Sequence, residues 1–191
     1  MEISGHTQML IGSPVGHSGS PAMYNYSFQK LGLDYVYLAF DIKEEDTSKA
    51  INALRLLNVK GFNITMPGKT AALSCCDELS KAAQLIGAVN TVVNENGKLI
   101  GHNTDGLGWV RNCREHGFEI RGKKMTIAGS GGAATAIEIT SALEGMSEIS
   151  IFARKDTFFA NAEATVEKIR RHVSGCRVNL YDLEDRDLFY H

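Results

Sequence analysis

The chain has 191 residues, of which 43% are apolar and 22% are charged, and its formal net charge is −2. This composition is typical of a globular protein and excludes collagen-like, disulfide-scaffold and wholly disordered chains. Lysine and arginine do not outnumber aspartate and glutamate, so we expect no nucleic-acid partner.

The four cysteines, Cys75, Cys76, Cys113 and Cys176, form no C-x-x-C pair. We therefore expect neither a metal site nor a disulfide framework. The N-terminus lacks a basic segment followed by an apolar one, and no apolar run reaches the roughly 20 residues of a membrane-spanning helix. Free thiols then suit a cytoplasmic protein that does not contact membranes.

Strand and helix patterns alternate along the first half of the chain. Runs of apolar and β-branched residues predict strands, and apolar residues three or four positions apart predict helices. Asn96-Gly97 stands between two predicted strands and indicates a type I′ hairpin turn. The predicted strands are 8–11, 35–42, 62–66, 89–95 and 98–102, and the predicted helices are 22–31, 44–58 and 79–86.

The second half follows the same alternation. Asp105 stands in the N-cap position of a predicted helix that ends at Gly117. The alternation predicts an α/β protein, and we expect two lobes with a cleft between them, 1–104 and 105–191. The second lobe supplies a partial Rossmann-type fold, about one βαβαβ half. Its predicted strands are 125–128, 149–152 and 177–181, and its predicted helices are 107–116, 133–146 and 158–173.

A glycine-rich turn carries the clearest nucleotide-binding pattern. Gly129-Ser130-Gly131-Gly132-Ala133-Ala134 fits G-x-G-x-x-A between a predicted strand and a predicted helix. Gly129 allows the tight turn, Gly131 lets the backbone approach a pyrophosphate, and the helix N-terminus offers amide donors. In this context the motif predicts a dinucleotide site. A plain glycine turn and a methyltransferase-like S-adenosylmethionine site are the alternatives.

Three charged residues follow the next predicted strand, where a dinucleotide-binding unit meets the adenosine ribose. An acid there binds the 2′-hydroxyl of NAD, and an arginine accommodates the 2′-phosphate of NADP. Arg154, Lys155 and Asp156 offer both, so the choice between NAD and NADP stays open. A solvated charged loop is the alternative for each of them.

Hydroxyl, amide and charged side chains gather in the loops of the first half. Ser18 and Ser20 precede a helix, where they can cap it or hold an anion. Lys69 follows a strand, and a lysine with a lowered pKa can move protons. Asn90 and Asp105 add an amide and a carboxylate. Taken alone, helix capping and a surface lysine also explain these residues.

Together these segments resemble the shikimate dehydrogenase family from about Leu10 to the end of the chain. The motifs are H-S-x-S-P, N-x-T-x-P-x-K, G-A-V-N-T, N-T-D-G and G-x-G-G-A, in that order. Met66-Pro67 and the run 154–159 resemble the quinate/shikimate dehydrogenase subclass. The resemblance implies an NAD(P)-dependent enzyme, monomeric or homodimeric, of aromatic amino acid biosynthesis. Its substrate would be shikimate, which it would interconvert with 3-dehydroshikimate, or quinate, paired with 3-dehydroquinate.

The resemblance also implies a role for each matching residue. Lys69 and Asp105 would be the catalytic pair: Lys69 relays the hydroxyl proton and Asp105 orients the hydroxyl while hydride leaves for the nicotinamide. The substrate-binding residues would be Ser18, Ser20, Tyr37, Thr65 and Asn90, and the cofactor-binding residues would be Gly129, Ser130, Gly131, Gly132, Ala133, Arg154, Lys155, Asp156 and Phe158.

The chain departs from the family pattern in two loops and toward its end. Gly19 stands where the family usually has a larger apolar residue, and Gly68 where it usually has Asn, His or Phe. Both glycines are expected to loosen their loops. Later family segments, among them an N-A-T-P-x-G-M-like loop, have no counterpart, which predicts an unpaired strand edge beside the Gly129 strand. A truncated, non-catalytic remnant that keeps only a substrate-binding lobe is therefore the alternative to an active dehydrogenase.

Overall fold

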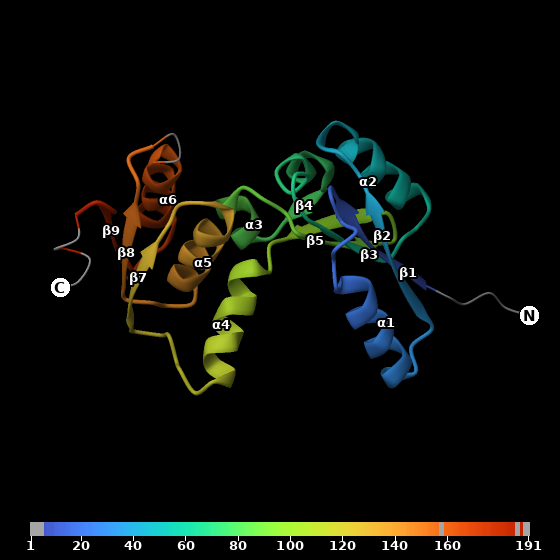
Figure 1. The fold of residues 1–191 in the computed structure, drawn as a ribbon, viewed down its shortest axis with the longest axis horizontal. Coiled ribbons are helices and arrows are strands. Elements are labelled where there is room, and N and C mark those ends of the chain that lie inside the picture. Colours follow the sequence, from blue (N-terminus) through green and yellow to red (C-terminus); the bar gives the residue numbers. More distant parts are fainter. Residues whose placement is uncertain (1–5, 157–158, 186–187, 189–191) are drawn as a thin grey trace, which may run out of the picture. The chain divides into compact units, whose positions relative to one another are not determined.

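A computed structural model describes residues 6–156, 159–185 and 188. The chain divides into two compact units, Met1–His102 and Asn103–His191, which we call the first and the second unit. The boundary lies close to the one expected from the sequence. Each unit has its own sheet and its own helices (Figure 1), so the predicted α/β class is confirmed.

The first unit is built on a six-stranded mixed sheet in the order β2-β1-β3-β5-β6-β4. β1 pairs in parallel with both β2 and β3, while β5 and β6 form an antiparallel hairpin. Asn96 and Gly97 have φ angles of 55° and 94°, which fit the predicted hairpin turn. The strands are β1 (His6–Gly12), β2 (Tyr35–Asp41), β3 (Gly61–Ile64), β4 (Glu78–Leu79), β5 (Thr91–Glu95) and β6 (Lys98–His102).

Both faces of this sheet are covered near β1, and the sequence of β1 explains why. Successive side chains of a strand point to opposite faces. Met9 and Ile11 join the apolar cluster that contains Ile51 of α2, whereas Leu10 joins the cluster that contains Phe28 of α1. The helical segments of this unit are α1 (Ser20–Leu31), η1 (Glu44–Asp46), α2 (Thr47–Leu56), η2 (Ala71–Cys75) and α3 (Lys81–Ile86).

The second unit is a three-stranded parallel sheet in the order β7-β8-β9, with the strands joined by helices. The element order is one βαβαβ series preceded by a helix, as the sequence predicts, and this helix packs on α5. Its elements are α4 (Asp105–Glu115), β7 (Lys124–Ala128), α5 (Gly132–Leu143), β8 (Glu148–Ala153), α6 (Phe159–His172) and β9 (Arg177–Asp182).

Three local predictions were wrong. Leu79 lies in β4, and α3 begins only after Ser80, whose hydroxyl caps the helix by accepting from the Ala83 N–H at 3.2 Å. Asp105 is the first residue of α4, and Thr104 is its N-cap. The helix predicted over 44–58 ends at Leu56, and Leu57, which follows it, is 70% exposed. A two-residue strand and a helix end are too short for a periodicity to locate.

Candidate functional site

One pocket of the first unit gathers three of the predicted substrate-binding residues. It has a volume of about 420 Å³, and Ser18, Ser20 and Thr65 line it. Its walls come from the loops that follow β1 and β3, two parallel neighbours whose carboxyl ends meet at one edge of the sheet. The other lining residues are Leu10, Ser13, Pro14, Val15, His17, Gly19 and Met66.

Backbone hydrogen bonds hold these two loops together. The Thr65 N–H donates to the Ile11 carbonyl at 2.9 Å, and the Ser13 N–H donates to the Met66 carbonyl at 2.9 Å. Gly12 lies at the crossing point, where a Cβ would overlap the Thr65 Cγ2 and stand 2.8 Å from the Met66 oxygen. The close approach therefore requires glycine, a requirement that the motif analysis missed.

The two serines lie where helix α1 begins. The Ser20 N–H donates to the Ser18 Oγ at 3.2 Å, so capping does account for part of the role of Ser18. Gly19 is the N-cap residue and makes no side-chain cap, and no acidic residue stands in the first turn. Two half-buried hydroxyls thus face a helix N-terminus with positive partial charge, an arrangement that suits a carboxylate or another anion.

Thr65, Lys69 and Asn90 come from neighbouring segments that are tied together through the main chain. The Ile64 N–H donates to the Asn90 carbonyl at 2.8 Å, and the Val89 N–H donates to the Lys69 carbonyl at 2.9 Å. Lys69 is half-buried, and Asn90 is buried. Gly68 is buried against Thr47, whose hydroxyl would lie 2.9 Å from a Cβ there. This glycine therefore allows tight packing, in contrast to the loosening expected from the sequence.

A chain of polar side chains links Tyr37 to Asn90. The Tyr37 hydroxyl donates to the Asn63 Oδ1 at 2.7 Å, and the Asn63 amide donates to the Thr91 hydroxyl at 3.1 Å. The Thr91 hydroxyl in turn donates to the Asn90 Oδ1 at 3.0 Å. Burial raises the pKa of Tyr37, and its ring stacks on Tyr24 with 4.5 Å between ring centroids. Tyr37 is thus positioned to orient Asn90 through two intermediates.

Asn25 fixes the backbone of Tyr37 by a reciprocal pair of hydrogen bonds. Its amide donates to the Tyr37 carbonyl at 2.9 Å, and its Oδ1 accepts from the Tyr37 N–H at 2.8 Å. Sequence reasoning did not assign a role to Asn25. No spacing rule could find it, because the helix and the strand that it joins are separate elements with a loop between them.

The glycine turn of the second unit has the geometry that a dinucleotide needs. Gly129 has a φ of 131°, and no atom lies within 4 Å of a Cβ built at Gly131 or Gly132. Helix α5 begins at Gly132, and its N-cap Gly131 provides no side-chain cap. The turn therefore leaves space beside a helix N-terminus, which suits the pyrophosphate of a nicotinamide dinucleotide. Ser130 lies in the same turn, and Ala133 is the second residue of α5.

The remaining predicted site residues lie in the segment after β8 or, in the case of Asp105, at the start of α4. Lys155 pairs with Asp182 at the end of β9, with 3.2 Å between ammonium and carboxylate. The Asp156 N–H donates to the Arg154 carbonyl at 2.8 Å, so these residues form a tight turn. Phe158 lies outside the described residues. Lys69 belongs to the first unit and Asp105 to the second, so their pairing remains a prediction.

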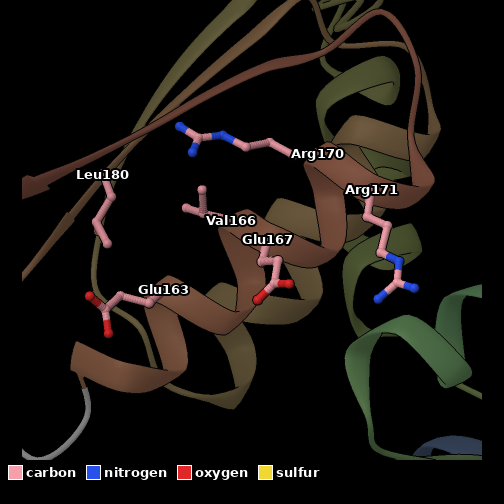
Figure 2. Close-up of a pocket in the computed structure, with 6 residues that line it drawn as sticks. All are labelled: Glu163, Val166, Glu167, Arg170, Arg171 and Leu180. Carbon is pink, nitrogen blue, oxygen red and sulfur yellow. The ribbon is translucent and has the colours of Figure 1, made fainter.

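A second cavity lies in the second unit, where α6 faces β9, and its volume is about 720 Å³ (Figure 2). The Arg170 guanidinium extends toward β9 and donates to the Val178 carbonyl at 2.6 Å. No residue that the sequence assigned to a site lines this cavity, and most of its lining side chains are charged. Its lining residues are Glu163, Val166, Glu167, Arg170, Arg171 and Leu180.

Two further kinds of site are absent from the described part of the chain. No helix in it is long and apolar enough to cross a membrane. No group of three or more His, Cys, Asp or Glu side chains in it could hold a metal ion. All four cysteines are free thiols.

Comparisons with known proteins agree with this geometry. A profile of the shikimate dehydrogenase substrate binding domain matches residues 10–92. The shikimate dehydrogenase (NADP(+)) of Listeria innocua serovar 6a is 54% identical over 187 residues, which are 97% of this chain and 64% of that protein. The chain thus spans less than two thirds of the length of this relative.

Solved structures show the same fold. Shikimate 5-dehydrogenase from Listeria monocytogenes, in complex with shikimate and NAD, matches with a TM-score of 0.95 and 51% identity, over 98% of this chain and 65% of that one. The ligand-free 5-ketofructose reductase of Gluconobacter sp. strain CHM43 matches with a TM-score of 0.86 and 31% identity, over 95% of this chain and 64% of that one.

Proposed function

The chain belongs to the shikimate dehydrogenase family, and we propose that it binds shikimate in the first unit and NADP or NAD at the glycine turn of the second. The proposed reaction interconverts shikimate and 3-dehydroshikimate. The main support is the pocket in which Ser18, Ser20 and Thr65 meet. Because the chain spans only 64% of the Listeria innocua relative, binding and turnover are separate parts of the proposal.

The carboxylate of shikimate would occupy the serine end of the pocket. The Ser18 and Ser20 hydroxyls can each donate a hydrogen bond to it, and the N-terminus of α1 adds a favourable partial charge. Thr65 would bind a ring hydroxyl, because it lines the same pocket from the β3 side. Asn90 would bind another, with its amide oriented by the Tyr37–Asn63–Thr91 chain.

Proton transfer would fall to Lys69. Oxidation of the secondary alcohol breaks a C–H bond and an O–H bond: the hydride would leave for the bound nicotinamide, and Lys69 would accept the hydroxyl proton and return it in the reverse reaction. The backbone of Lys69 is fixed by its hydrogen bond from Val89. Asp105 would orient the hydroxyl, as the family resemblance implies.

The glycine turn fits the dinucleotide, which supplies hydride acceptance when bound. The open space at Gly131 and Gly132 accommodates a pyrophosphate beside the α5 N-terminus. Arg154 would accommodate a 2′-phosphate, which supports NADP as the preferred cofactor and NAD as the second. A cytoplasmic location belongs to the same proposal, because free cysteines suit a reducing compartment.

Binding and turnover can be tested on the purified chain. Calorimetric titration with shikimate should give saturable binding, and Ser20→Ala should weaken it about tenfold or more, since a hydrogen bond to a carboxylate is lost. Ser27→Ala is the matched control, because the Ser27 hydroxyl donates to the Met23 carbonyl within α1 and does not line the pocket. Failure of the folded chain to bind shikimate would overturn the proposal.

Turnover is read as absorbance of the reduced nicotinamide, with NADP and NAD each paired with shikimate and with quinate. We expect shikimate with NADP to be the fastest pair, and Lys69→Ala to abolish turnover while shikimate still binds. Faster turnover of quinate would move the protein to the quinate/shikimate subclass. Shikimate binding without turnover would identify a substrate-binding remnant of the enzyme.

A further inference from the structure

Strand β8 ends without an acidic side chain, although the ribose of a dinucleotide lies near this strand end. In such a site an Asp or Glu binds the ribose 2′-hydroxyl of NAD. The last residue of β8 is Ala153, which is fully buried. Its register partner is Asp182, the last residue of β9, and the Leu183 N–H donates to the Ala153 carbonyl at 2.9 Å. The carboxylate level with the end of β8 therefore comes from the neighbouring strand.

Both oxygens of the Asp182 carboxylate are engaged, and one of them holds Lys155. The Oδ1 accepts from the Glu184 N–H at 3.0 Å, and the Oδ2 lies 3.2 Å from the Lys155 ammonium. These contacts, the backbone hydrogen bond first, lower the pKa of Asp182, so its negative charge is present at neutral pH. The Asp182 side chain is 25% exposed, whereas that of Lys155 is 68% exposed. A fixed carboxylate thus holds a lysine that solvent and ligands can reach.

The two cations that follow β8 therefore differ in what they can offer a ligand. Arg154 is exposed and forms no ion pair with any residue that the structure describes. Lys155, the next residue, already has a carboxylate partner. A 2′-phosphate carries about two negative charges at neutral pH and is stabilised by each cation that is available to it. Arg154 is available in this way, whereas Lys155 has to leave Asp182 first.

We propose, on the basis of the dinucleotide site proposed above, that Asp182 is a specificity-determining residue that limits the preference for NADP over NAD by holding Lys155. The carboxylate competes with the 2′-phosphate for the Lys155 ammonium, whose flexible stem can serve either partner. NAD has a hydroxyl in place of the phosphate and is insensitive to this competition. The motifs give Asp182 no role, because its place beside Lys155 depends on the pairing of β8 with β9.

The test compares two ligands that differ only by the phosphate, ADP-ribose and 2′-phospho-ADP-ribose. Neither contains nicotinamide, so their affinities, measured by calorimetric titration of the full chain, are independent of turnover. Asp182→Asn should raise the affinity for 2′-phospho-ADP-ribose about tenfold, because Lys155 is released to a phosphate, and should leave the affinity for ADP-ribose unchanged. Asparagine has nearly the shape of aspartate, and its Oδ1 can still accept from the Glu184 N–H.

Glu148→Gln is the matched control for the loss of one negative charge. The Glu148 side chain is 18% exposed and pairs with Lys124 at 3.1 Å. Both residues begin their strands, β8 and β7, and so lie at the opposite end of the same sheet from Asp182. This variant should change the affinity for neither ligand. A gain for 2′-phospho-ADP-ribose as large as that of Asp182→Asn would show that net charge alone is responsible and would overturn the proposal.

Lys155→Met shows whether the lysine carries the effect. In that background Asp182→Asn should raise the affinity for 2′-phospho-ADP-ribose by no more than about threefold, since only a screened repulsion is removed. A tenfold gain that persists without Lys155, or a ratio of the two affinities that Asp182→Asn leaves unaltered, overturns the proposal while the dinucleotide site stands. If neither ligand binds the folded, unaltered chain, the dinucleotide site itself is refuted, and the role of Asp182 with it.

Discussion

The two units treat their buried polar groups differently. In the first unit a buried polar side chain is satisfied by the main chain: Asn94 of β5 donates to the Val59 carbonyl at 3.0 Å and accepts from the Gly97 N–H at 2.7 Å. In the second unit, α5 buries Glu138, Thr140 and Ser141, whose side-chain oxygens have no hydrogen-bond partner among the described residues.

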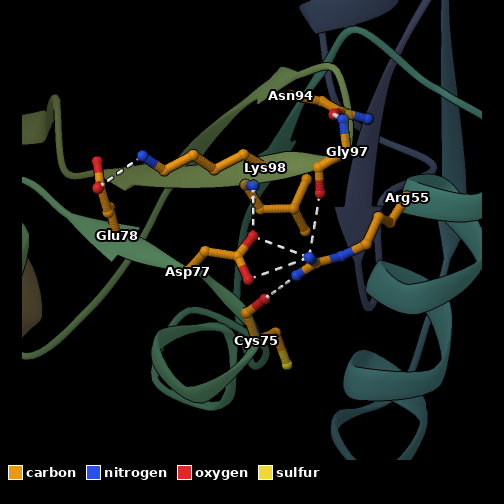
Figure 3. Close-up of polar contacts among 8 residues, drawn as sticks. Arg55, Cys75, Asp77, Glu78, Asn94, Gly97 and Lys98 are labelled. Atoms are coloured by element: carbon orange, nitrogen blue, oxygen red, sulfur yellow. Dashed lines mark hydrogen bonds and ion pairs between the residues drawn. The ribbon is translucent and has the colours of Figure 1, made fainter.

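The means of holding distant segments together differ in the same way. In the first unit Arg55 of α2 binds the Asp77 carboxylate at 2.8 and 3.1 Å and also donates to the carbonyls of Cys75 and Gly97 (Figure 3). In the second unit α4 and α5 approach so closely at Gly106 that a Cβ would overlap the Ala136 carbonyl and the Thr140 hydroxyl. The contact around Arg55 is thus directional and polar, whereas the contact at Gly106 is a steric fit.

The largest effect should come from breaking that steric fit. Gly106→Val inserts a branched side chain where α4 meets the backbone of α5, and neither helix can move without losing its packing. We expect a loss of about 3 kcal/mol or more in the stability of the second unit. Urea unfolding followed by fluorescence reports it, since Trp109 of α4 is the only tryptophan of the chain.

Gly108→Ala is the control in the same helix. No atom lies within 4 Å of a Cβ at Gly108, so only the backbone preference changes. Alanine should raise the unfolding midpoint and stabilise the unit by up to about 1 kcal/mol. Equal destabilisation by both substitutions would show that the contact at Gly106 is not what holds the two helices.

The sequence could predict features that depend on local backbone conformation, but not contacts between segments that are distant along the chain. The hairpin at Asn96-Gly97 and the turn at Gly129 were predicted because local backbone conformation dictates glycine at such positions. The N-T-D-G motif was read for its carboxylate, yet the need for Gly106 arises from helix α5, about thirty positions away, which no local pattern encodes. Spacing could likewise not show that Tyr37 is linked to Asn90 through Asn63 and Thr91, because sheet pairing brings these residues together.

Glu138 should give the next largest effect, as a dependence of stability on pH. Burial raises the pKa of this carboxyl to about 8, so the folded state binds its proton more tightly than the unfolded state. The contribution to stability is therefore complete below about pH 4.5 and is lost as the pH rises toward 8. Between pH 4.5 and 7 the loss should be roughly 3 kcal/mol, measured as the unfolding midpoint across that range.

Glu138→Gln should flatten this pH dependence, because an amide does not titrate. Glu163→Gln, at an exposed position of α6 in the same unit, should leave the slope unchanged. If the buried amide itself destabilises the fold, it lowers the unfolding midpoint equally at every pH, so the slope with pH is not affected. A slope that persists in Glu138→Gln would assign the titration to another group and remove Glu138 from the contrast between the units.

The smallest effect should follow from Arg55→Met, because the polar contacts of the first unit are redundant and partly exposed. The Asp77 carboxylate keeps its hydrogen bond from the Leu99 N–H at 2.7 Å, which is the main cause of its lowered pKa, with the Arg55 guanidinium second. We expect a lower unfolding midpoint, by less than Gly106→Val causes, and faster amide exchange in the hairpin.

Arg111→Met is the control, because it removes an exposed i,i+4 pair with Glu115 and should change neither the unfolding midpoint nor the amide exchange. If Arg55→Met lowers the free energy of unfolding as much as Gly106→Val does, the remaining bonds do not suffice to keep the hairpin in place. The contacts of Arg55 would then be as necessary to the first unit as the steric fit at Gly106 is to the second.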